Sequence, residues 1–258
     1  MIIGLLIGLT GTGGGTLMTP VMILVMGVKP VVAIGTDLAY SAITRIIGGG
    51  AHLRQHTVHR RAAWLLAVGS VPSTILGVGL MDRIRSADPS FVNLFLLRAL
   101  GWALIVVALA LIAKPAITAV ALRGRAATTE GDWRENMLAA GDRTPWVLPL
   151  IGAAVGFMVG LTSVGAGSLV IIALLFLYPR WSSRDLVGTD VFHAAVLSTA
   201  AGIAQFASGN VNVPMMGSLL IGSIPGVLVG SRLAFGFPEQ LLRLTLAAVL
   251  LVSGAKLV

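Results

Sequence analysis

The sequence predicts an all-α polytopic membrane protein made of two homologous four-segment repeats, with the first segment of each repeat broken by glycines. Three observations lead to this fold class. Of the 258 residues, 56% are hydrophobic and only 11% are charged, which is far from the composition of soluble domains. The apolar residues fall into segments of membrane-spanning length. Patterns in the first half recur in the second half at a nearly constant offset.

The segments follow from counting apolar residues, because a spanning helix needs about 20 of them. The first half contains four segments, at 2–27, 30–53, 62–81 and 91–113. Pro30 opens the second of these, and proline is favoured at the first position of a helix. Residues 1–113 are therefore predicted to form the N-terminal transmembrane repeat.

A polar stretch at 114–145 separates the two halves and is predicted to be a cytoplasmic linker. The second half then contains apolar segments at 146–178, 184–208, 213–235 and 238–258. Residues 146–258 are predicted to form the C-terminal transmembrane repeat.

Two glycine-rich breaks lie in the first segments of the halves and align at an offset of 152 residues. The small and hydroxylated residues of the breaks are Thr10, Thr12, Gly13, Gly14, Gly15 and Thr16 in the first, and Thr162, Ser163, Gly165, Gly167 and Ser168 in the second. Two further motifs repeat at an offset of 153: Gly35-Thr36-Asp37 as Gly188-Thr189-Asp190, and Gly69-Ser70-Val71-Pro72 as Gly222-Ser223-Ile224-Pro225. Agreement over several segments indicates an internal duplication.

The arms on either side of each break are too short to cross a bilayer alone. If both broken segments are re-entrant hairpins, each half crosses three times, and the two repeats are inverted with six full crossings. Under this topology eleven Lys or Arg residues lie in loops on one side and three on the other, with Lys256 at the C-terminus. If all eight segments span, the same loops divide six against eight. The positive-inside rule therefore favours the inverted arrangement.

Non-helical backbone at membrane depth survives only where protein buries it or water lines it. The second arm of each broken segment is a half-helix whose free N–H groups point toward the midplane, and the Thr and Ser hydroxyls of the breaks add donors there. Two such ends facing each other predict a binding site for an anion. The alternative is that the small residues only allow helices to pack closely.

The residues at the first break resemble the TauE/SafE family of sulfite exporters and related permeases. The resemblance lies in Gly11-x-Gly13-Gly14-Gly15-x-Leu17 followed by Pro20, and in Gly27-x-x-Pro30-x-x-Ala33-x-Gly35-Thr36. It runs the whole length of the chain, including the degenerate second copy. It implies export or permeation of sulfite, sulfonates or other small sulfur-containing organic anions.

Arg45 lies in the middle of the second apolar segment, and its repeat counterpart is Ser198. A charged residue inside a membrane segment is costly and marks a functional site by default. Arg45 is therefore a candidate counter-ion for an anionic substrate. The alternatives are snorkelling and pairing with Asp37, which lies two turns away.

Other polar residues within the apolar segments occupy matched positions in the two halves. Asp37 and Asp190 either couple transport to protons or cap their helices together with Thr36 and Thr189. Tyr40 and His193 follow the aspartates by one turn, and a histidine can titrate near neutral pH. Pro72 and Pro225 are candidate hinges. The coupling or gating candidates are Asp37, Asp190, Tyr40, His193, Pro72 and Pro225.

Several function classes are disfavoured. The net charge of +8 comes from basic loops and indicates topology, and no nucleic-acid partner is expected. The chain has no cysteine, and no cofactor is implied. His52, His56 and His59 have metal-ligand spacing, but the neighbouring arginines favour membrane anchoring over a metal site. A membrane enzyme, including an aspartyl protease using the two aspartates, lacks a fitting nucleophile and base.

We therefore expect a secondary transporter in the cell (inner) membrane that moves a small anion, sulfite or an organosulfonate, by alternating access between the two breaks. No nucleotide-binding motif is present, so an ion or substrate gradient supplies the energy, with a proton or another ion as the coupling partner. A passive anion channel with the same constriction is the alternative. A homodimer is a further expectation.

Overall fold

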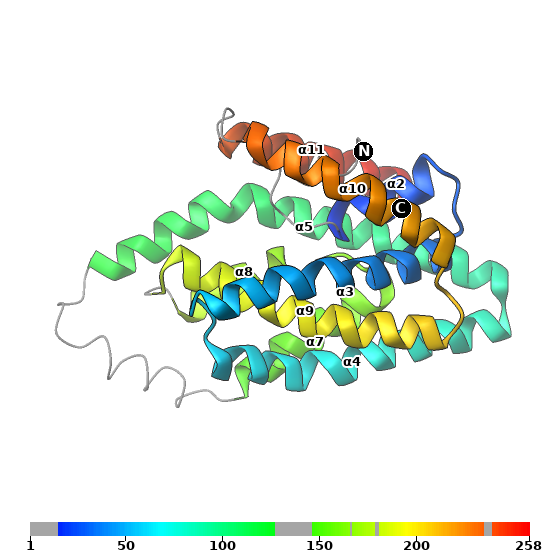
Figure 1. Ribbon diagram of the computed structural model, residues 1–258, viewed down its shortest axis with the longest axis horizontal. Helices are drawn as coiled ribbons and strands as arrows, with labels where there is room; N and C mark the ends of the chain where they lie inside the picture. The colour runs from blue at the N-terminus through cyan, green and yellow to red at the C-terminus, as the bar shows by residue number, and fades with distance from the viewer. Residues whose placement is uncertain (1–14, 127–145, 166, 179–180, 235–238) are drawn as a thin grey trace.

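The computed structural model describes residues 15–126, 146–165, 167–178, 181–234 and 239–258, and within them the chain is helical (Figure 1). The helices are α2 (Gly15–Leu24), α3 (Pro30–Arg54), α4 (Arg60–Ala87), α5 (Pro89–Ala126), α7 (Val147–Thr162), α8 (Ser168–Leu177), α9 (Ser183–Ala207), α10 (Val213–Ala234) and α11 (Glu239–Leu257).

Five helices of the described part are long and apolar enough to cross a membrane. They are Pro30–Arg54, Arg60–Ala87, Phe91–Pro115, Ser183–Ala207 and Gln240–Leu257. Shorter apolar helices are Val147–Thr162, Ser168–Leu177 and Val213–Ser223, the last being the first half of α10. The chain is thus a helical, multi-pass membrane protein, as predicted. The helix predicted to end at residue 113 instead continues to Ala126, into the stretch predicted as linker.

Helices α3 and α9, which correspond to each other in the repeat, lie side by side and run antiparallel (Figure 1). At one end of the pair, a β-carbon on Gly35 would lie 2.6 Å from the backbone oxygen of Asn210. At the other end, a β-carbon on Gly188 would lie 2.5 Å from the backbone oxygen of Thr57. Each end therefore needs glycine for the same reason, a close approach to the loop of the other half. The two contacts consist of repeat-matched residues.

Helix α7 packs against the first half of α4 and runs in the same direction (Figure 1). Gly152, Gly156 and Gly160 form one face of α7, and β-carbons there would meet the backbone at Leu66, Ser70 and Thr74 respectively. The Thr74 hydroxyl also donates a hydrogen bond to the Gly156 carbonyl. Small residues four apart let two helices approach closely. Because α7 ends at Thr162, it runs alongside only part of α4.

The chain after α8 returns to the start of α4. The Trp181 ring stacks on the His59 ring with centroids 3.8 Å apart, and on the Tyr178 ring at 4.2 Å. His59 immediately precedes α4, near which α7 also begins. The α7–α8 segment therefore starts and finishes at the same end of α4. Burial lowers the pKa of His59, opposed in part by Asp185, so the stacked imidazole is neutral at pH 7.

The remaining contacts complete the helical bundle. Helices α5 and α11 pack through Gly101 and Gly254, where an added β-carbon at either position would lie 2.9 or 2.8 Å from the other glycine's carbonyl oxygen. A large apolar core joins α3, α4, α5, α7, α8 and α9, and a second joins α2, α5 and α11. Asp37 of α3, described below, is reached by side chains of α2 and of the turn after α7.

Candidate functional site

Asp37 on α3 is the residue at which the two broken segments meet. Its side chain is fully buried. Its Oδ2 atom accepts a hydrogen bond from the Thr19 hydroxyl of α2 at 2.6 Å and another from the Ser163 hydroxyl at 2.8 Å. Ser163 ends α7 in the second glycine break, and α2 is the helix that follows the first break. One carboxylate oxygen thus links both halves of the chain.

The other oxygen, Oδ1 of Asp37, is buried and has no hydrogen-bond partner among the described residues. Oδ1 of Asp190 and Nδ1 of His193 are also buried without a hydrogen-bond partner among the described residues. A buried polar atom without a partner costs about 1–3 kcal/mol, so native proteins rarely retain one without a reason. The Ser41 hydroxyl on α3, one turn from Asp37, also lacks a partner, and this group of atoms indicates a place where a ligand, a proton or water belongs.

The aspartates do not cap their helices, contrary to one of the two sequence-based interpretations. Helix α3 begins at Pro30 and α9 at Ser183, so Asp37 and Asp190 lie well inside them. The true cap of α9 is Ser182, whose hydroxyl accepts from the backbone N–H of Asp185. A carboxylate one or two turns inside a helix cannot reach the free N–H groups of its first turn.

The threonines of the Gly-Thr-Asp motifs form hydrogen bonds to the backbone of the other half of the chain. The Thr36 hydroxyl accepts from the backbone N–H of Asn212, just before α10, at 3.0 Å. The Thr189 hydroxyl accepts from the backbone N–H of His59, just before α4, also at 3.0 Å. These two bonds join repeat-matched pairs, as do the glycine contacts beside them. In each motif, glycine permits the approach, threonine binds the next helix start, and aspartate reaches the centre.

Tyr40 and His193, the next matched pair, also make matched hydrogen bonds. The Tyr40 hydroxyl donates to the Ser223 hydroxyl of α10 at 2.8 Å. Nε2 of His193 lies 2.9 Å from the Ser70 hydroxyl of α4. Both serines belong to the duplicated Gly-Ser-Val/Ile-Pro motif, and both rings are buried. The sequence identifies the two serines as repeated residues but does not predict their hydrogen-bond partners, which only the fold shows.

Arg45 lies where α3 crosses α9, opposite its own repeat counterpart. One guanidinium nitrogen, Nη1, is 3.5 Å from the Ser198 hydroxyl, at the outer limit of a hydrogen bond. Arg45 interacts electrostatically with both Asp37 and Asp190. Among the described residues, neither carboxylate comes within ion-pair distance of it. The alternative of an Arg45–Asp37 ion pair is therefore not formed, and most of the N–H groups of the Arg45 guanidinium make no hydrogen bond to the described residues.

The second break has the form that the sequence predicts. Helix α7 ends at Thr162, and α8 begins at Ser168. Ser163 adopts left-handed backbone geometry (φ 62°), and Gly165 has φ 101°, a conformation that favours glycine. Gly167 precedes α8 as its N-cap. The chain therefore reverses here through two residues of positive φ, one on each side of Val164.

The hydroxyls of the second break have different roles. Thr162 donates to the Met158 carbonyl and accepts from the Val164 N–H, so its hydroxyl is used locally. Ser163 donates to Asp37. The Ser168 hydroxyl is buried without a partner in the described part of the chain. Of the predicted donors in this break, only Ser168 is free for a ligand.

The first break lies mostly outside the described residues. The structure does not describe Thr10, Thr12, Gly13 and Gly14. Their predicted role in binding stays a prediction. Gly15 and Thr16 open helix α2, as expected for the half-helix after the break. Thr19, one turn further along α2, was missed by the sequence analysis although it contacts Asp37. Its spacing of three residues from Thr16 is the signal that could have indicated it.

The histidines with metal-ligand spacing are used in other ways. Nδ1 of His52 lies 3.0 Å from the Thr57 hydroxyl, and His59 stacks on Trp181. The matched residue of His52, Gln205, accepts from the Asn210 side-chain amide at 2.7 Å. These contacts fasten the loops that follow α3 and α9.

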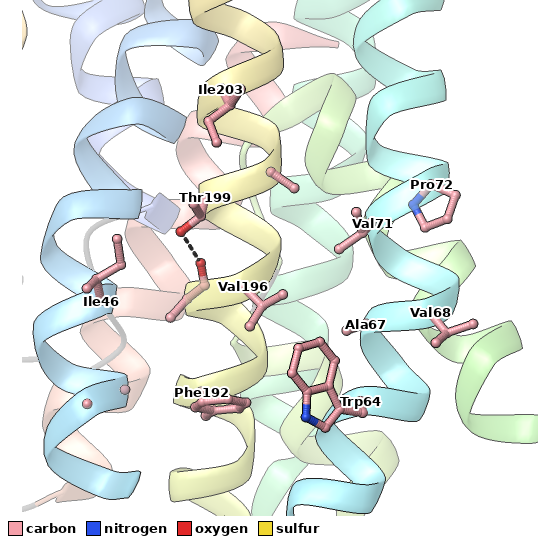
Figure 2. A pocket seen from close by; sticks show the side chains of 14 residues that line it. Ile46, Trp64, Ala67, Val68, Val71, Pro72, Phe192, Val196, Thr199 and Ile203 are labelled. Carbon is pink, nitrogen blue, oxygen red and sulfur yellow. Dashed lines mark hydrogen bonds between the residues drawn. The ribbon is translucent and has the colours of Figure 1, made fainter.

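A groove of about 920 Å³ lies between α3, α4 and α9 (Figure 2). Trp64, Val68 and Pro72 of α4 line one side, and Phe192 and Ile203 of α9 line the other. Thr199 also lines the groove, and its hydroxyl donates a hydrogen bond to the Ala195 carbonyl at 2.7 Å (Figure 2). This hydroxyl therefore has no hydrogen left to donate to a ligand in the groove. This apolar groove suits hydrocarbon and not a small anion. Helices α4 and α10 continue through Pro72 and Pro225, and the predicted hinge function of these prolines stays a prediction.

Comparison with known proteins agrees with the membrane architecture. A family model described as "Sulfite exporter TauE/SafE" matches residues 1–257. A protein of Bacillus subtilis (strain 168) named "Probable membrane transporter protein YjnA" is 39% identical over 262 residues, covering 100% of this chain and 96% of the relative.

More distant relatives have similar names. "Probable membrane transporter protein YunE" of the same organism is 26% identical, covering 100% of this chain and 96% of the relative. A "Probable membrane transporter protein" of Xylella fastidiosa (strain Temecula1 / ATCC 700964) is 27% identical, with coverages of 90% and 81%. No solved structure matches the chain.

Proposed function

The chain belongs to the TauE/SafE sulfite exporter family and is a membrane transporter, and from this premise we propose that it is a secondary transporter of a small anion. The observation that carries the proposal is the meeting of Ser163, Thr19 and Asp37 near Arg45. Hydroxyl donors and a guanidinium with unspent N–H groups are the chemistry that binds an oxyanion. Asp37 and Arg45 lie inside α3, away from both of its ends, and a transporter holds its substrate within the membrane.

The proposed substrate is sulfite or an organosulfonate. The family description supports a sulfur oxyanion. Such a group has several acceptor oxygens around one centre, which matches a guanidinium fork and single hydroxyl donors on different elements. The buried Ser168 hydroxyl at the start of α8 adds a donor at a helix N-terminus.

We propose that the two halves are inverted repeats. The support lies in contacts that map onto each other under the repeat offset: Tyr40 with Ser223 corresponds to His193 with Ser70, and Thr36 with Asn212 corresponds to Thr189 with His59. In every case the partner comes from the opposite half. Exchange of partners between two antiparallel halves is what a two-fold axis in the membrane plane produces.

The α7–α8 segment would then be a re-entrant hairpin that enters and leaves on the cytoplasmic side. The contacts near the start of α4 support this, since Gly152 of α7 and Trp181 after α8 both lie there. The broken segment at the N-terminus would enter from the other side. Movement of one repeat against the other would expose the central site alternately to each side. The full burial of Asp37 favours this over a passive channel, which needs a continuous wet path.

Cysteine labelling tests the topology, and the natural absence of cysteine leaves no background. Lys29→Cys and Val213→Cys, both at exposed positions, are expected to react with an impermeant thiol reagent from one side of the membrane. Gln55→Cys and Arg184→Cys are expected to react from the other side. If Lys29 and Val213 label from opposite sides, as they would if all eight segments spanned, the inverted arrangement is wrong.

Thermal unfolding of the purified protein in a panel of anions tests the function. Sulfite, sulfate, thiosulfate, sulfoacetate, taurine and lactate form the panel. A ligand that binds only the folded state adds about 2.7 kcal/mol of stability at 100 times its dissociation constant, and so raises the midpoint. We expect a shift with one or more of the sulfur oxyanions and none with lactate. The absence of a shift with every anion would contradict the proposal.

A further inference from the structure

We propose that Asp37 is the coupling group of the transporter: its carboxylate occupies the donors of the anion site, and the anion binds when Asp37 takes up a proton. This inference rests on the proposed function and adds to it the partner ion, a proton, and the residue that carries it. It makes the protein a proton–anion symporter with one proton for each singly charged anion.

The first step is that the two hydroxyl donors in contact with Asp37 are already used. A hydroxyl has one hydrogen to donate. Thr19 and Ser163 both give theirs to Oδ2 of Asp37, at 2.6 and 2.8 Å. While Asp37 is ionised, neither hydroxyl can serve a second anion. The carboxylate therefore competes with the substrate as an anion of the protein itself.

The second step is the charge of the centre. The titratable or charged groups that face this region are Arg45 and Tyr40 on α3, and Asp190 and His193 on α9. The described parts of α2, α7, α8 and α10 contribute no ionisable side chain next to Asp37. With both aspartates ionised, Arg45 leaves one net negative charge. A bound monoanion would make it two, among buried groups whose charges are weakly screened.

A proton on Asp37 removes both obstacles. It neutralises the carboxylate, so the centre with a bound monoanion has the same net charge as the empty centre. It also weakens the hold of Oδ2 on the two hydroxyls, because a neutral acceptor forms weaker bonds. The proton comes from water and resides on Oδ1, the oxygen without a partner among the described residues. An O–H bond of the donating hydronium ion breaks as the Oδ1–H bond forms, and no other covalent bond changes.

The duplication itself indicates why the residue is Asp37 and not Asp190. At the repeat offset of the breaks, Thr19 corresponds to Ile171 and Ser163 corresponds to Gly11. Neither counterpart has a hydroxyl. The aspartate was retained in both halves, but among the described residues the pair of hydroxyl donors is found at Asp37 and not at Asp190. Asp190→Asn is therefore a matched control that removes an equal charge from the equivalent position.

The test measures binding of methanesulfonate, whose charge stays constant over the range used. Its dissociation constant would be determined calorimetrically in the full-length protein from about pH 5 to about pH 8. In the wild type we expect the affinity to fall by up to about tenfold for each pH unit in the upper range, as linkage to one proton requires. In Asp37→Asn the affinity should be independent of pH. In Asp190→Asn the affinity should still depend on pH as it does in the wild type, and it should differ from the wild-type affinity by the same factor at every pH.

Proton uptake provides a second measurement that does not depend on any variant being stable. In weakly buffered solution, the wild type should take up about one proton for each methanesulfonate bound at high pH. Zero uptake would overturn the inference while leaving an anion transporter. So would an unchanged pH dependence in Asp37→Asn, or its loss only in Asp190→Asn. Affinity that follows sodium and not pH would replace the proton with a metal cation.

Failure of the function proposed above would look different. If the wild type binds neither methanesulfonate nor any anion of the thermal panel at any pH, both the anion transporter and the coupling role of Asp37 are wrong.

Discussion

Arg45→Ala is expected to weaken binding of the transported anion by roughly 10- to 100-fold, the loss of a hydrogen-bonded charge worth about 1.5–3 kcal/mol. Transport into vesicles should fall to background at substrate concentrations near the wild-type affinity. The reason is that Arg45 is the one cation that the described residues place near Asp37 and Asp190. Its nearest polar partner is a serine hydroxyl at 3.5 Å, so its donors are available to a ligand.

Two variants separate the charge of Arg45 from its packing. Arg45→Lys keeps the charge but lacks the planar fork, so affinity should fall to a value between those of the wild type and Arg45→Ala. Ser198→Ala removes only the long contact and should bind the anion almost as the wild type does. Wild-type affinity in Arg45→Ala, in a protein with a normal unfolding transition, would show that the anion binds elsewhere.

Gly156→Val is expected to prevent folding or to lower the free energy of unfolding by at least about 3 kcal/mol. Gly156 is the middle of the three glycines through which α7 packs on α4. A β-carbon there would meet the Ser70 carbonyl, and would lie 2.5 Å from the Ser73 hydroxyl and 2.6 Å from the Ser70 α-carbon. Backbone cannot yield as a flexible side chain can, so the two helices would have to separate.

The separation would also disturb the centre. Ser70 is the partner of His193, and Ser163 lies at the end of α7. Gly79→Val is the matched control, because Gly79 also lies in a helix but a β-carbon there meets nothing within 4 Å. Yields and unfolding midpoints of the two variants in the same detergent give the comparison. Equal stability of Gly156→Val and Gly79→Val would contradict the close packing of α7 on α4.

The sequence predicted most of the fold because the signals are local or periodic. Membrane helices can be recognised by their hydropathy, because only long apolar segments whose backbone hydrogen bonds are satisfied within the segment can cross lipid. The breaks near Gly15 and Gly167 were located because a run of glycine and hydroxyl residues stands out within such a segment. The helix that begins at Pro89 is longer than the sequence predicts. The polar composition after Lys114 indicated a linker, but the chain remains helical to Ala126.

The site was predicted only in outline. The sequence singled out Asp37, Tyr40, His193 and Arg45, because polar residues are conspicuous in apolar helices. It did not reveal the partner of any of them. The capping interpretation of Asp37 was wrong because proximity in sequence to a helix start was taken for proximity to its free N–H groups.

The sequence by itself determined that this protein is a helical membrane protein with motifs repeated in its two halves, and which polar residue types lie inside its apolar segments, because hydropathy and repetition are properties of the chain alone. Only the tertiary structure decided that Thr19 and Ser163 donate to the same oxygen of Asp37, and that Tyr40 and His193 bind serines of the opposite half. Ser163 is 126 positions from Asp37, and Ser223 is 183 from Tyr40. Hydrogen bonds over such separations depend on how helices pack, and the close approaches at Gly35, Gly156 and Gly188 set that packing.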